Sequence, residues 1–434
     1  MVKEIFEKVK GNILFNTSYP YDKSIWNKYL VKDDLFSNDD TIPEISFYIH
    51  IPFCKNLCKF CEYTRFNNIS EDDESYYVDL LEKQVDDFIS GKIIANLKGI
   101  DIGGGTPSLL NTRNLERVLK LSKKLQITSH VIIIDDKFIP SIEGSFATWT
   151  EDKIKLLSEY GIRRVSMGVQ TVSKSILESN DREVNPLYKM EEIFNLLRKY
   201  NIEKINLDFM YGLSDNIDGI NSNIELIRRL KPEHVTLYET RYNMNLLDKP
   251  KTVNRDTVFN QYSLFYSNLR VEGYDARFGM NTFSNCNDKG LSSYLENRMF
   301  NFVPYKGFGI AAQSCNYSGL SYNVGKNNTS FKDCIKDDKI TEEYIYKLPD
   351  DELAGKYVAI SLYSGQFDML TLAKIIKQEP YVYYKDELDF LLENKLVELS
   401  CDTMMRLTPK GFKEYGAVAT LFAGKDSREY ILNL

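Results

Sequence analysis

Residues 48–61 read YIHIPFCKNLCKFC, an apolar alternation typical of a strand that runs directly into three cysteines. The spacing of Cys54, Cys58 and Cys61 is C-x3-C-x2-C. Three thiolates this close can hold three irons of a [4Fe-4S] cluster and leave the fourth iron without a protein ligand. A Cys3His zinc site is the alternative, but His50 precedes the first cysteine and no later histidine lies nearby, which is poor zinc-ligand spacing.

An aromatic residue, Phe60, comes just before the third cysteine, and this motif resembles that of the radical S-adenosylmethionine (SAM) superfamily. The preceding Y-I-H-I-P-F-C, which contains Tyr48, is similar to the branch of oxygen-independent coproporphyrinogen III oxidases. The resemblance implies that SAM chelates the open iron through its amino and carboxylate groups, beside Tyr48 and Phe60. One electron, from a donor such as flavodoxin or ferredoxin, would then cleave SAM to a 5'-deoxyadenosyl radical.

Composition indicates an ordinary globular protein, with 43% hydrophobic and 27% charged residues in 434. We expect a cytoplasmic monomer with reduced thiols, because no apolar run approaches the ~18 residues of a membrane span and the start does not resemble a signal peptide. The four remaining cysteines are scattered rather than arranged as a disulfide framework. A net charge of −7 argues against a nucleic-acid partner, so we expect a small-molecule substrate.

Strands alternate with helices of ten to fifteen residues from residue 45 to about residue 250, which predicts parallel βαβ units in an α/β fold. About six units are too few for a complete eight-stranded barrel. The resemblance implies a partial (β/α)6 barrel whose open side admits a large substrate.

Four segments are predicted. They are an N-terminal arm (1–44), the partial barrel (45–250), an extension with a substrate segment (251–330) and a winged-helix-like α+β domain (331–434). Within them, residues 273–278 are predicted to form a strand, and the polar region 316–350 a linker or excursion.

The glycine-rich turn 103–107 follows a strand and precedes a helix, where residues without Cβ let a ligand approach the backbone closely. It resembles the family's G-G-T-P loop, so Gly104, Gly105 and Thr106 are expected to meet the amino group of SAM. The stretch beginning at Ile142 resembles the next strand end of the family, which gives Glu143 the role of binding the ribose hydroxyls. A carboxylate suits two hydroxyl donors; a glutamate that serves only the local turn is the alternative.

Three further residues are predicted to bind SAM. Gln170 ends the strand 164–169, at the barrel edge where ligands bind. Arg182 matches the family arginine that meets the SAM carboxylate, an anion that a guanidinium suits. Asp208 matches the family aspartate on the strand 204–209. A surface arginine and a turn aspartate are the alternatives for the last two.

A second SAM molecule is expected over the barrel, because Phe302, Val303 and Gln313 match the region where relatives bind one. Two departures weaken the likeness to the oxidases: Val303 replaces a glutamine and Gln313 a hydrophobic residue. A third is Tyr63, which stands where the oxidases carry a fourth cysteine.

Three functions remain open from the sequence. The first, which we favour, is a two-SAM C-methyltransferase or related carbon transfer to an sp2 carbon. The second is oxidative decarboxylation of coproporphyrinogen III. The third, haem binding or haem trafficking without turnover, is the least favoured, because none of the three histidines lies in the glycine-rich C-terminal turn.

Overall fold

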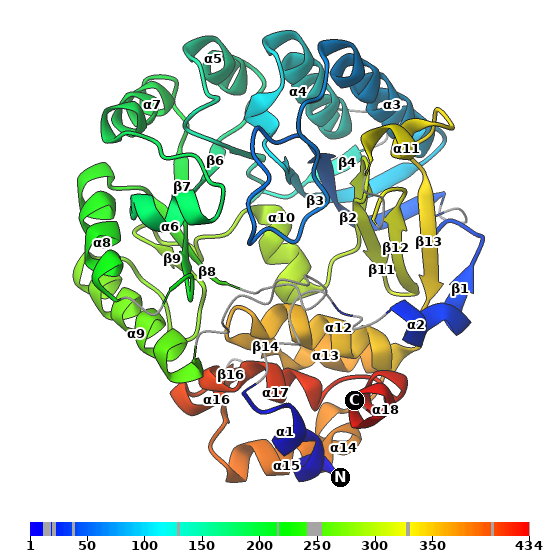
Figure 1. Ribbon diagram of the computed structural model, residues 1–434. Helices are drawn as coiled ribbons and strands as arrows, with labels where there is room; N and C mark the ends of the chain where they lie inside the picture. Colours follow the sequence, from blue (N-terminus) through cyan, green and yellow to red (C-terminus); the bar gives the residue numbers. More distant parts are fainter. Residues whose placement is uncertain are drawn as a thin grey trace.

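One long, curved sheet forms the body of the protein in the computed structural model (Figure 1). The structure describes residues 1–11, 19, 23–36, 40–127, 131–214, 217–240, 254–326, 330–400 and 403–433. Within these residues the sheet has 13 strands, ordered β1-β13-β12-β11-β10-β2-β3-β5-β6-β7-β8-β9, with β4 paired to β3.

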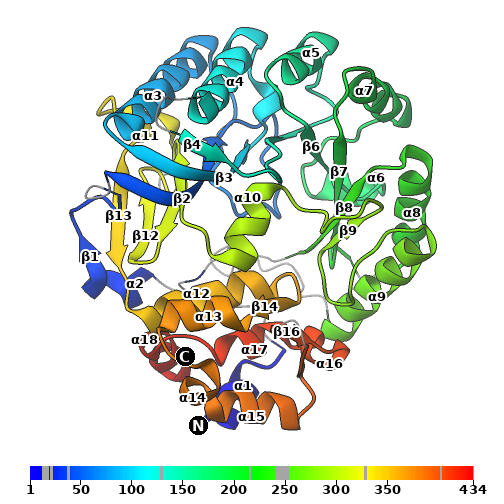
Figure 2. The ribbon, with the colours of Figure 1, turned by 180° about the vertical axis from the view of Figure 1, so that it is seen from behind.

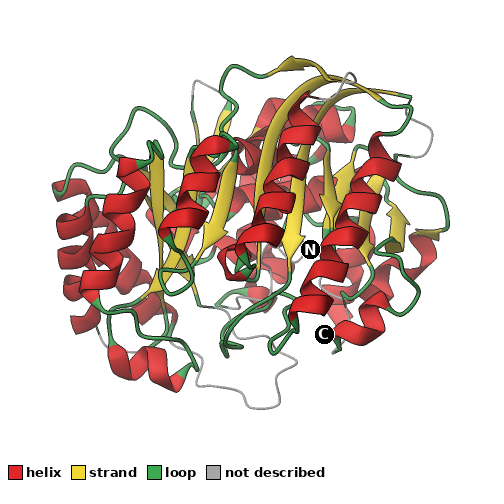
Figure 3. Ribbon diagram, turned by 90° about the horizontal axis from the view of Figure 1, so that it is seen from above, coloured by secondary structure: helices red, strands yellow, loops and turns green. Residues whose placement is uncertain are grey.

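The centre of this sheet is the partial barrel expected from the sequence. Its parallel strands are β2 (Thr41–Ile51), β3 (Ile93–Gly104), β5 (Ser141–Gly144), β6 (Arg164–Gln170), β7 (Lys204–Tyr211) and β8 (His234–Glu239), with β4 (Val131–Ile134) beside β3. The main helices that follow these strands are α3 (Glu71–Ile89), α4 (Thr112–Ile127), α5 (Glu151–Glu159), α7 (Leu187–Lys199), α8 (Asp218–Leu230) and α9 (Arg255–Val271). These helices cover the outside of the curved sheet, while the inside faces a central space (Figures 1 and 3).

The alternation in β2 decides which side chains face the central space. Phe47, Ile49 and Ile51 are fully buried, and the ring of Phe47 packs edge-on to Phe88 of α3, with centroids 6.0 Å apart. Side chains alternate across a strand, so the intervening Tyr48 and His50 point the other way, into the barrel. The same strand therefore anchors the core and delivers the cysteine loop to the barrel rim.

Residues 316–350, predicted to be a linker, are instead part of the main sheet. The parallel strand β10 (Tyr305–Phe308) pairs with β2, and β11 (Gln313–Asn316), β12 (Gly319–Asn323) and β13 (Glu342–Lys347) continue it in antiparallel fashion, with the short helix α11 (Phe331–Ile335) between the last two. The polar composition misled the prediction because β12 is buried even at its serine and asparagine, Ser321 and Asn323.

The strand predicted at residues 273–278 is wrong. This stretch makes one isolated bridge, from Asp275 to Ser284, and the edge strand is β9 (Thr282–Ser284). The apolar alternation arises instead from packing, since the ring of Phe278 lies edge-on to Tyr262 of α9 at 5.3 Å.

The inside of the barrel is partly filled by α10 (Ser293–Glu296) and the π-helical turn Asn297–Asn301 that continues it (Figure 1). Tyr294 stacks on Tyr48, with ring centroids 5.5 Å apart. Gly99 of β3 lets this helix approach, because a Cβ there would lie 2.4 Å from the backbone nitrogen of Tyr294. The helix thereby divides a packed part of the barrel from the space beside the cysteine loop.

The C-terminal segment lies across the open side of the barrel (Figures 1 and 2). It has a small sheet ordered β14-β16-β15, consistent with the α+β prediction. Its elements are α12 (Asp350–Leu362), β14 (Gln366–Asp368), α13 (Met369–Ile376), α14 (Pro380–Tyr383), α15 (Lys385–Glu393), β15 (Val397–Leu399), β16 (Met404–Leu407), α16 (Pro409–Lys413), α17 (Tyr415–Thr420) and α18 (Lys425–Asn433).

The N-terminal arm packs mainly on this C-terminal segment. Its elements are α1 (Val2–Val9), α2 (Lys23–Trp26), a 3-10 turn (Asn27–Tyr29) and β1 (Leu30–Val31), which pairs with β13. Tyr19 and Trp26 are fully buried. The four segment boundaries remain predictions, although β13 of the main sheet falls inside the predicted segment 331–434.

Candidate active site

The three-cysteine loop leaves β2 and is closed at its base by backbone pairing. The amide of Cys54 donates to the carbonyl of Phe66 (2.9 Å), and the amide of Phe66 donates to the carbonyl of Pro52 (2.7 Å). Between these points the chain is free of regular structure, so Cys54, Cys58 and Cys61 project from one short loop.

Arg65, which the sequence analysis did not single out, organises that loop. Its guanidinium donates to the carbonyls of Cys58 (2.6 Å), Cys61 (2.8 Å) and Tyr63 (2.9 Å). These bonds hold the carbonyl oxygens on one side of the loop. Its positive charge also opposes the effect of burial, which raises the pKa of the Cys61 thiol. A nearby cation favours the thiolate form that binds metal.

The glycine-rich turn lies against the same loop. The amide of Thr106 donates to the carbonyl of Phe53 (2.7 Å), and its hydroxyl lies 3.7 Å from the Cys54 sulfur. Gly104 has a φ of +113°, and a Cβ there would lie 2.7 Å from the His50 ring. A Cβ on Gly105 would lie 2.6 Å from the Phe53 carbonyl oxygen. Glycine is therefore required for the turn to approach the cysteine loop this closely.

These residues fit an iron–sulfur cluster better than a single zinc ion. All three cysteines are free thiols. Three cysteines on one loop suit a cluster that has one open iron. A Cys3His zinc site would need a histidine beside them, and the ring of His50 instead lies against the carbonyl oxygen of Thr64 (3.3 Å).

Arg182 lies on the opposite side of the cysteine loop. Its guanidinium donates to the carbonyl of Gly168 (2.6 Å) and lies 3.8 Å from the Cys58 sulfur. Gln170, at the end of β6, adopts a φ of +66°. A Cβ on Gly168 would lie 2.4 Å from the amide nitrogen of the Gln170 side chain. The structure thus brings Gln170, Arg182 and the cluster loop together, as the sequence predicted.

Three carboxylates face the barrel interior, and we call Asp101, Glu143 and Asp208 the acidic wall. Glu143 accepts a hydrogen bond from the Gly104 amide (3.0 Å). Desolvation raises the pKa of Glu143 to about 7, and the negative charges of Asp208 and Asp101 add to this. The Asp208 carboxylate accepts from Ser166 (2.9 Å) and Asn206 (2.7 Å), while its burial raises its pKa.

Asp101 was not predicted from the sequence. One of its oxygens accepts from the Ser292 hydroxyl (2.5 Å), and the other is buried with no hydrogen-bond partner among the described residues. Burial raises its pKa to about 7. The acidic wall therefore has a high affinity for protons or for a positively charged ligand.

The sequence of the barrel matches a known family. The family model of the Radical SAM superfamily matches residues 48–227, from the start of the cysteine motif to α8. This part of the chain is therefore similar to the radical SAM superfamily. The curated relatives of the chain include heme chaperones and oxygen-independent coproporphyrinogen III oxidases.

Two curated relatives illustrate this similarity. The chain is 28% identical over 322 residues to the "Heme chaperone HemW" of Buchnera aphidicola, covering 73% of this chain and 78% of the relative. It is 27% identical over 259 residues to the "Oxygen-independent coproporphyrinogen III oxidase" of Cereibacter sphaeroides, covering 58% of this chain and 55% of that oxidase. The match to this oxidase therefore spans about half of its length.

The fold extends the similarity over most of the chain. Coproporphyrinogen III oxidase (HemN) from Escherichia coli superposes with a TM-score of 0.71 at 20% identity, covering 89% of this chain and 91% of the oxidase. At this identity the likeness establishes the fold alone.

The residues predicted for a second SAM lie at the turn between the π-helical turn and β10 and on the neighbouring strand β11. Phe302 and Val303 are buried, and the ring of Phe302 contacts Tyr317 and Tyr357, with centroids 5.6 and 5.8 Å away. Gln313 accepts from the Arg298 guanidinium (3.2 Å) and donates to the Tyr322 hydroxyl (2.7 Å). The protein itself thus engages all three side chains.

Tyr63 and Phe60 stay close to the cysteine loop. Tyr63, in the position of the oxidases' fourth cysteine, is 65% exposed, and Phe60 is half-buried. Tyr63 thus leaves space rather than a fourth thiol beside the cluster. Of the histidines, His50 lies 3.3 Å from the carbonyl oxygen of Thr64, and burial lowers its pKa to about 4, so its ring is neutral. His130 lies outside the described residues.

The other group of potential metal ligands, His234, Cys286 and Asp288, is part of an ion-pair network. Lys204 lies 3.0 Å from Asp288, and the Arg164 guanidinium lies 3.5 Å from the His234 ring. Two cations beside the group make a further cation unfavourable there.

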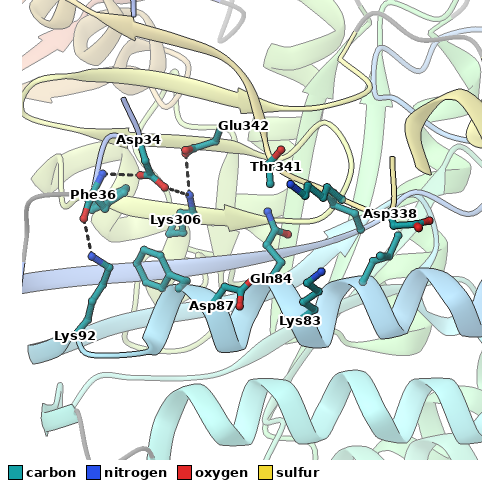
Figure 4. Close-up of a pocket in the computed structure, with 14 residues that line it drawn as sticks. Asp34, Phe36, Lys83, Gln84, Asp87, Lys92, Lys306, Asp338, Thr341 and Glu342 are labelled. Atoms are coloured by element: carbon teal, nitrogen blue, oxygen red, sulfur yellow. Dashed lines mark hydrogen bonds and ion pairs between the residues drawn. The ribbon is translucent and has the colours of Figure 1, made fainter. Parts of the chain in front are cut away.

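A groove of about 340 Å³ on the outer face, between α3 and β13, is lined in part by residues that bind one another (Figure 4). Lys306 pairs with Glu342 (2.8 Å) and Asp34 (3.7 Å), and Lys92 donates to the Phe36 carbonyl (2.7 Å). None of the cluster or SAM residues lines this groove. Among the described residues, no helix is both long and apolar enough to span a membrane.

Proposed function

We propose that this protein is a radical SAM enzyme that removes a hydrogen atom from a carboxylate-bearing tetrapyrrole. The observation that carries the proposal is the convergence of the three-cysteine loop, the glycine-rich turn, Glu143 and Arg182 at one rim of the barrel. No other set of described residues combines thiols with groups suited to a nucleoside and an amino acid.

Each polar group has a role in this proposal. Glu143 binds the ribose hydroxyls, and Arg182 binds the carboxylate of SAM. The backbone of Gly104, Gly105 and Thr106 meets the amino group. Cys54, Cys58 and Cys61 would hold a [4Fe-4S] cluster, which when bound would supply the electron for reductive cleavage of SAM. The protein then holds the substrate within reach of the resulting 5'-deoxyadenosyl radical, which converts a bimolecular step into an effectively unimolecular one.

The relatives support a tetrapyrrole as the substrate class, since one is named a haem chaperone and another a coproporphyrinogen III oxidase. On a propionate side chain, the 5'-deoxyadenosyl radical would take one hydrogen atom and become 5'-deoxyadenosine. Release of carbon dioxide would leave a vinyl group and pass one electron to a one-electron acceptor. We propose flavodoxin or ferredoxin as the electron carrier that reduces the cluster.

Haem binding without turnover is the second candidate, supported by the similarity to HemW. His50 and His234 are both engaged with protein partners, so neither offers a free axial ligand in the described structure. C-methylation, the function favoured from the sequence, has no support from the relatives, which are not methyltransferases. C-methylation and the binding of a second SAM molecule therefore remain predictions, which the assay described next also tests.

One anaerobic assay separates the three functions. Reconstituted protein is incubated with dithionite, methyl-deuterated SAM and either coproporphyrinogen III or haem, and products are analysed by mass spectrometry. We expect 5'-deoxyadenosine without deuterium and a tetrapyrrole that has lost carbon dioxide. Deuterated 5'-deoxyadenosine with S-adenosylhomocysteine would favour methyl transfer instead. Tight haem binding with no 5'-deoxyadenosine would favour the chaperone function.

The control is Cys286→Ala, which removes a thiol outside the cluster loop and should leave product formation unchanged. Cys58→Ala should abolish it. Equal 5'-deoxyadenosine from both variants would contradict the proposal.

A further inference from the structure

Lys356 of α12 is a fully buried ammonium group without a carboxylate partner. It is 0% exposed, and its one hydrogen-bond acceptor among the described residues is the Tyr19 carbonyl, 3.4 Å away. No described carboxylate lies within 4.0 Å of its nitrogen, although other lysines of the chain make such ion pairs. Burying an unpaired charge costs free energy unless a ligand or a partner supplies the opposite charge.

The two other buried lysines show how this chain normally treats such a group. Lys306 forms a 2.8 Å ion pair with Glu342. Lys153 donates to the carbonyls of Ser108 (2.7 Å) and Thr148 (3.3 Å). Lys356 is more deeply buried than either and has the weakest set of partners in the part of the chain that the structure describes.

Arg298, on the π-helical turn inside the barrel, is a second cation without a carboxylate partner. Its guanidinium lies over the ring of Tyr305, 4.8 Å from the centroid, and over that of Tyr294 at 5.9 Å. It donates to Gln313 (3.2 Å) and weakly to the Tyr294 hydroxyl (3.4 Å), and its Nε is buried with no acceptor among the described residues. Gln313 thus positions the guanidinium without neutralising it.

Arg298 and Lys356 lie on elements that pack together, and we call them the cationic pair. The hydroxyl of Tyr357, next to Lys356 on α12, donates to the carbonyl of Phe300 (3.0 Å) on the π-helical turn that carries Arg298. Burial lowers the pKa of Lys356 to about 7, and the positive charge of Arg298 lowers it further. Arg298 is also close enough to Asp101, on the inner face of the barrel, to lower the pKa of that carboxyl. The cationic pair therefore extends from the barrel interior to α12, the helix across its open side (Figure 1).

We propose that the cationic pair binds a carboxylate group of a ligand held in the barrel. The proposal rests on the proposed function for the identity of that ligand. A carboxylate would accept hydrogen bonds from both cations and provide the missing negative charge. Two molecules can supply this chemistry: a propionate side chain of a tetrapyrrole substrate, or the carboxylate of a second SAM.

The first test measures binding without turnover. Cluster-loaded protein is titrated with coproporphyrin III, the stable oxidised form of the porphyrinogen, and with its fully amidated derivative, which lacks carboxylates. Lys356→Met keeps the length of the side chain and removes its charge, and Arg298→Gln keeps part of the hydrogen bonding. The control is Lys374→Met, which removes an exposed lysine from the neighbouring helix α13.

We expect each variant of the cationic pair to bind coproporphyrin III roughly 10- to 100-fold more weakly, the usual effect of losing a charged hydrogen bond. The amidated porphyrin should bind wild type and variants alike, and Lys374→Met should match wild type. Unchanged affinity for both porphyrins in both variants, together with an unchanged number of bound SAM molecules in the second test, would overturn the proposal.

The second test identifies the source of the carboxylate. Equilibrium dialysis with labelled SAM counts the molecules bound per chain. If Lys356→Met loses one of two bound SAM molecules and keeps its porphyrin affinity, the carboxylate belongs to SAM. If porphyrin affinity alone falls, it belongs to the tetrapyrrole.

These readouts do not depend on catalysis. Wild-type protein that binds the porphyrin through the cationic pair but cannot cleave SAM would contradict the proposed function and support this inference. If the variants of the cationic pair bind porphyrin like wild type while the wild-type protein is active, this inference fails and the proposed function is supported.

Discussion

The acidic wall and the cationic pair are two oppositely charged regions of the same barrel, and they differ in how their charges are satisfied. Each carboxyl group of the acidic wall has at least one close hydrogen bond from the protein, from Ser292 to Asp101, from Gly104 to Glu143 and from Ser166 to Asp208. Neither cation of the cationic pair has a described carboxylate within ion-pair distance, although the charge of Arg298 reaches Asp101 and lowers the pKa of that carboxyl. The wall is thus held in place before any ligand arrives, whereas the pair is not neutralised until one binds.

The two regions also suit different parts of the proposed reactants. SAM carries a positive sulfonium and a ribose, which match carboxylates. A tetrapyrrole carries propionates, which match an ammonium and a guanidinium. With the proposed reactants, the barrel would sort a cationic cofactor from an anionic substrate by charge, although the net charge of the whole chain is −7. Local charge rather than net charge decides what the barrel binds.

The largest effect is expected at the loop beside the acidic wall. Replacing Cys54, Cys58 and Cys61 together by alanine should remove the cluster, because no other described group can take over as ligand for its irons. Iron and sulfide analysis should fall from about four irons per chain to none, with loss of the brown absorbance and of 5'-deoxyadenosine. A triple variant that keeps its iron would refute the assignment of these ligands.

A smaller effect is expected when single SAM contacts are removed. Glu143→Ala and Arg182→Ala should each weaken SAM binding roughly ten- to a hundred-fold, since a charged hydrogen bond contributes ~1.5 to 3 kcal/mol. Calorimetric titration of SAM into the cluster-loaded protein measures this. Glu151→Ala, which removes an exposed ion pair with Lys199, is the matched control. Unchanged SAM affinity in both site variants would mean that the acidic wall and Arg182 serve only the fold.

The smallest effect concerns stability. The change of stability with pH has opposite signs for the cationic pair and the acidic wall. The pKa of Lys356 is lowered from 10.5 to about 7 in the folded protein. Between about pH 7 and 10.5 the unfolded chain therefore binds more protons at this group, so its contribution to the free energy of unfolding rises with pH. Lys356→Met removes that dependence. Without porphyrin, the variant should be more stable than wild type at pH 7.5, by on the order of 1 kcal/mol or more, and the difference should shrink towards pH 10.

Denaturant unfolding at several pH values measures this difference, with Lys374→Met as the control for loss of a positive charge. A raised carboxyl pKa, as at Asp101, acts in the opposite direction: stability falls as pH rises from 3.8 to about 7. If the stability of Lys356→Met follows that of wild type at every pH, the ammonium is not destabilising and the comparison of the two regions fails.

The sequence alone placed the three cysteines and most of the residues proposed to bind SAM beside one another, because their chemistry is local. Cys54, Cys58 and Cys61 lie on one loop, and the glycine-rich turn follows the next strand of the barrel. Parallel strands end at the same edge, so residues at successive strand ends meet without any knowledge of distant packing. The strands and helices of the barrel could be predicted from their alternation along the chain, because this pattern is also local.

Only the tertiary structure revealed Arg65, Asp101 and the cationic pair. Arg298 and Lys356 come from different segments and meet because α12 lies across the open side of the barrel, a packing that no local pattern encodes. The sheet region 316–350 was missed for a related reason: its buried polar residues are satisfied by neighbouring strands rather than by solvent. A pattern of hydrophobic and polar residues predicts which side of a strand is buried. It does not predict where a buried charge lacks a partner, and that depends on every chain segment packed around it.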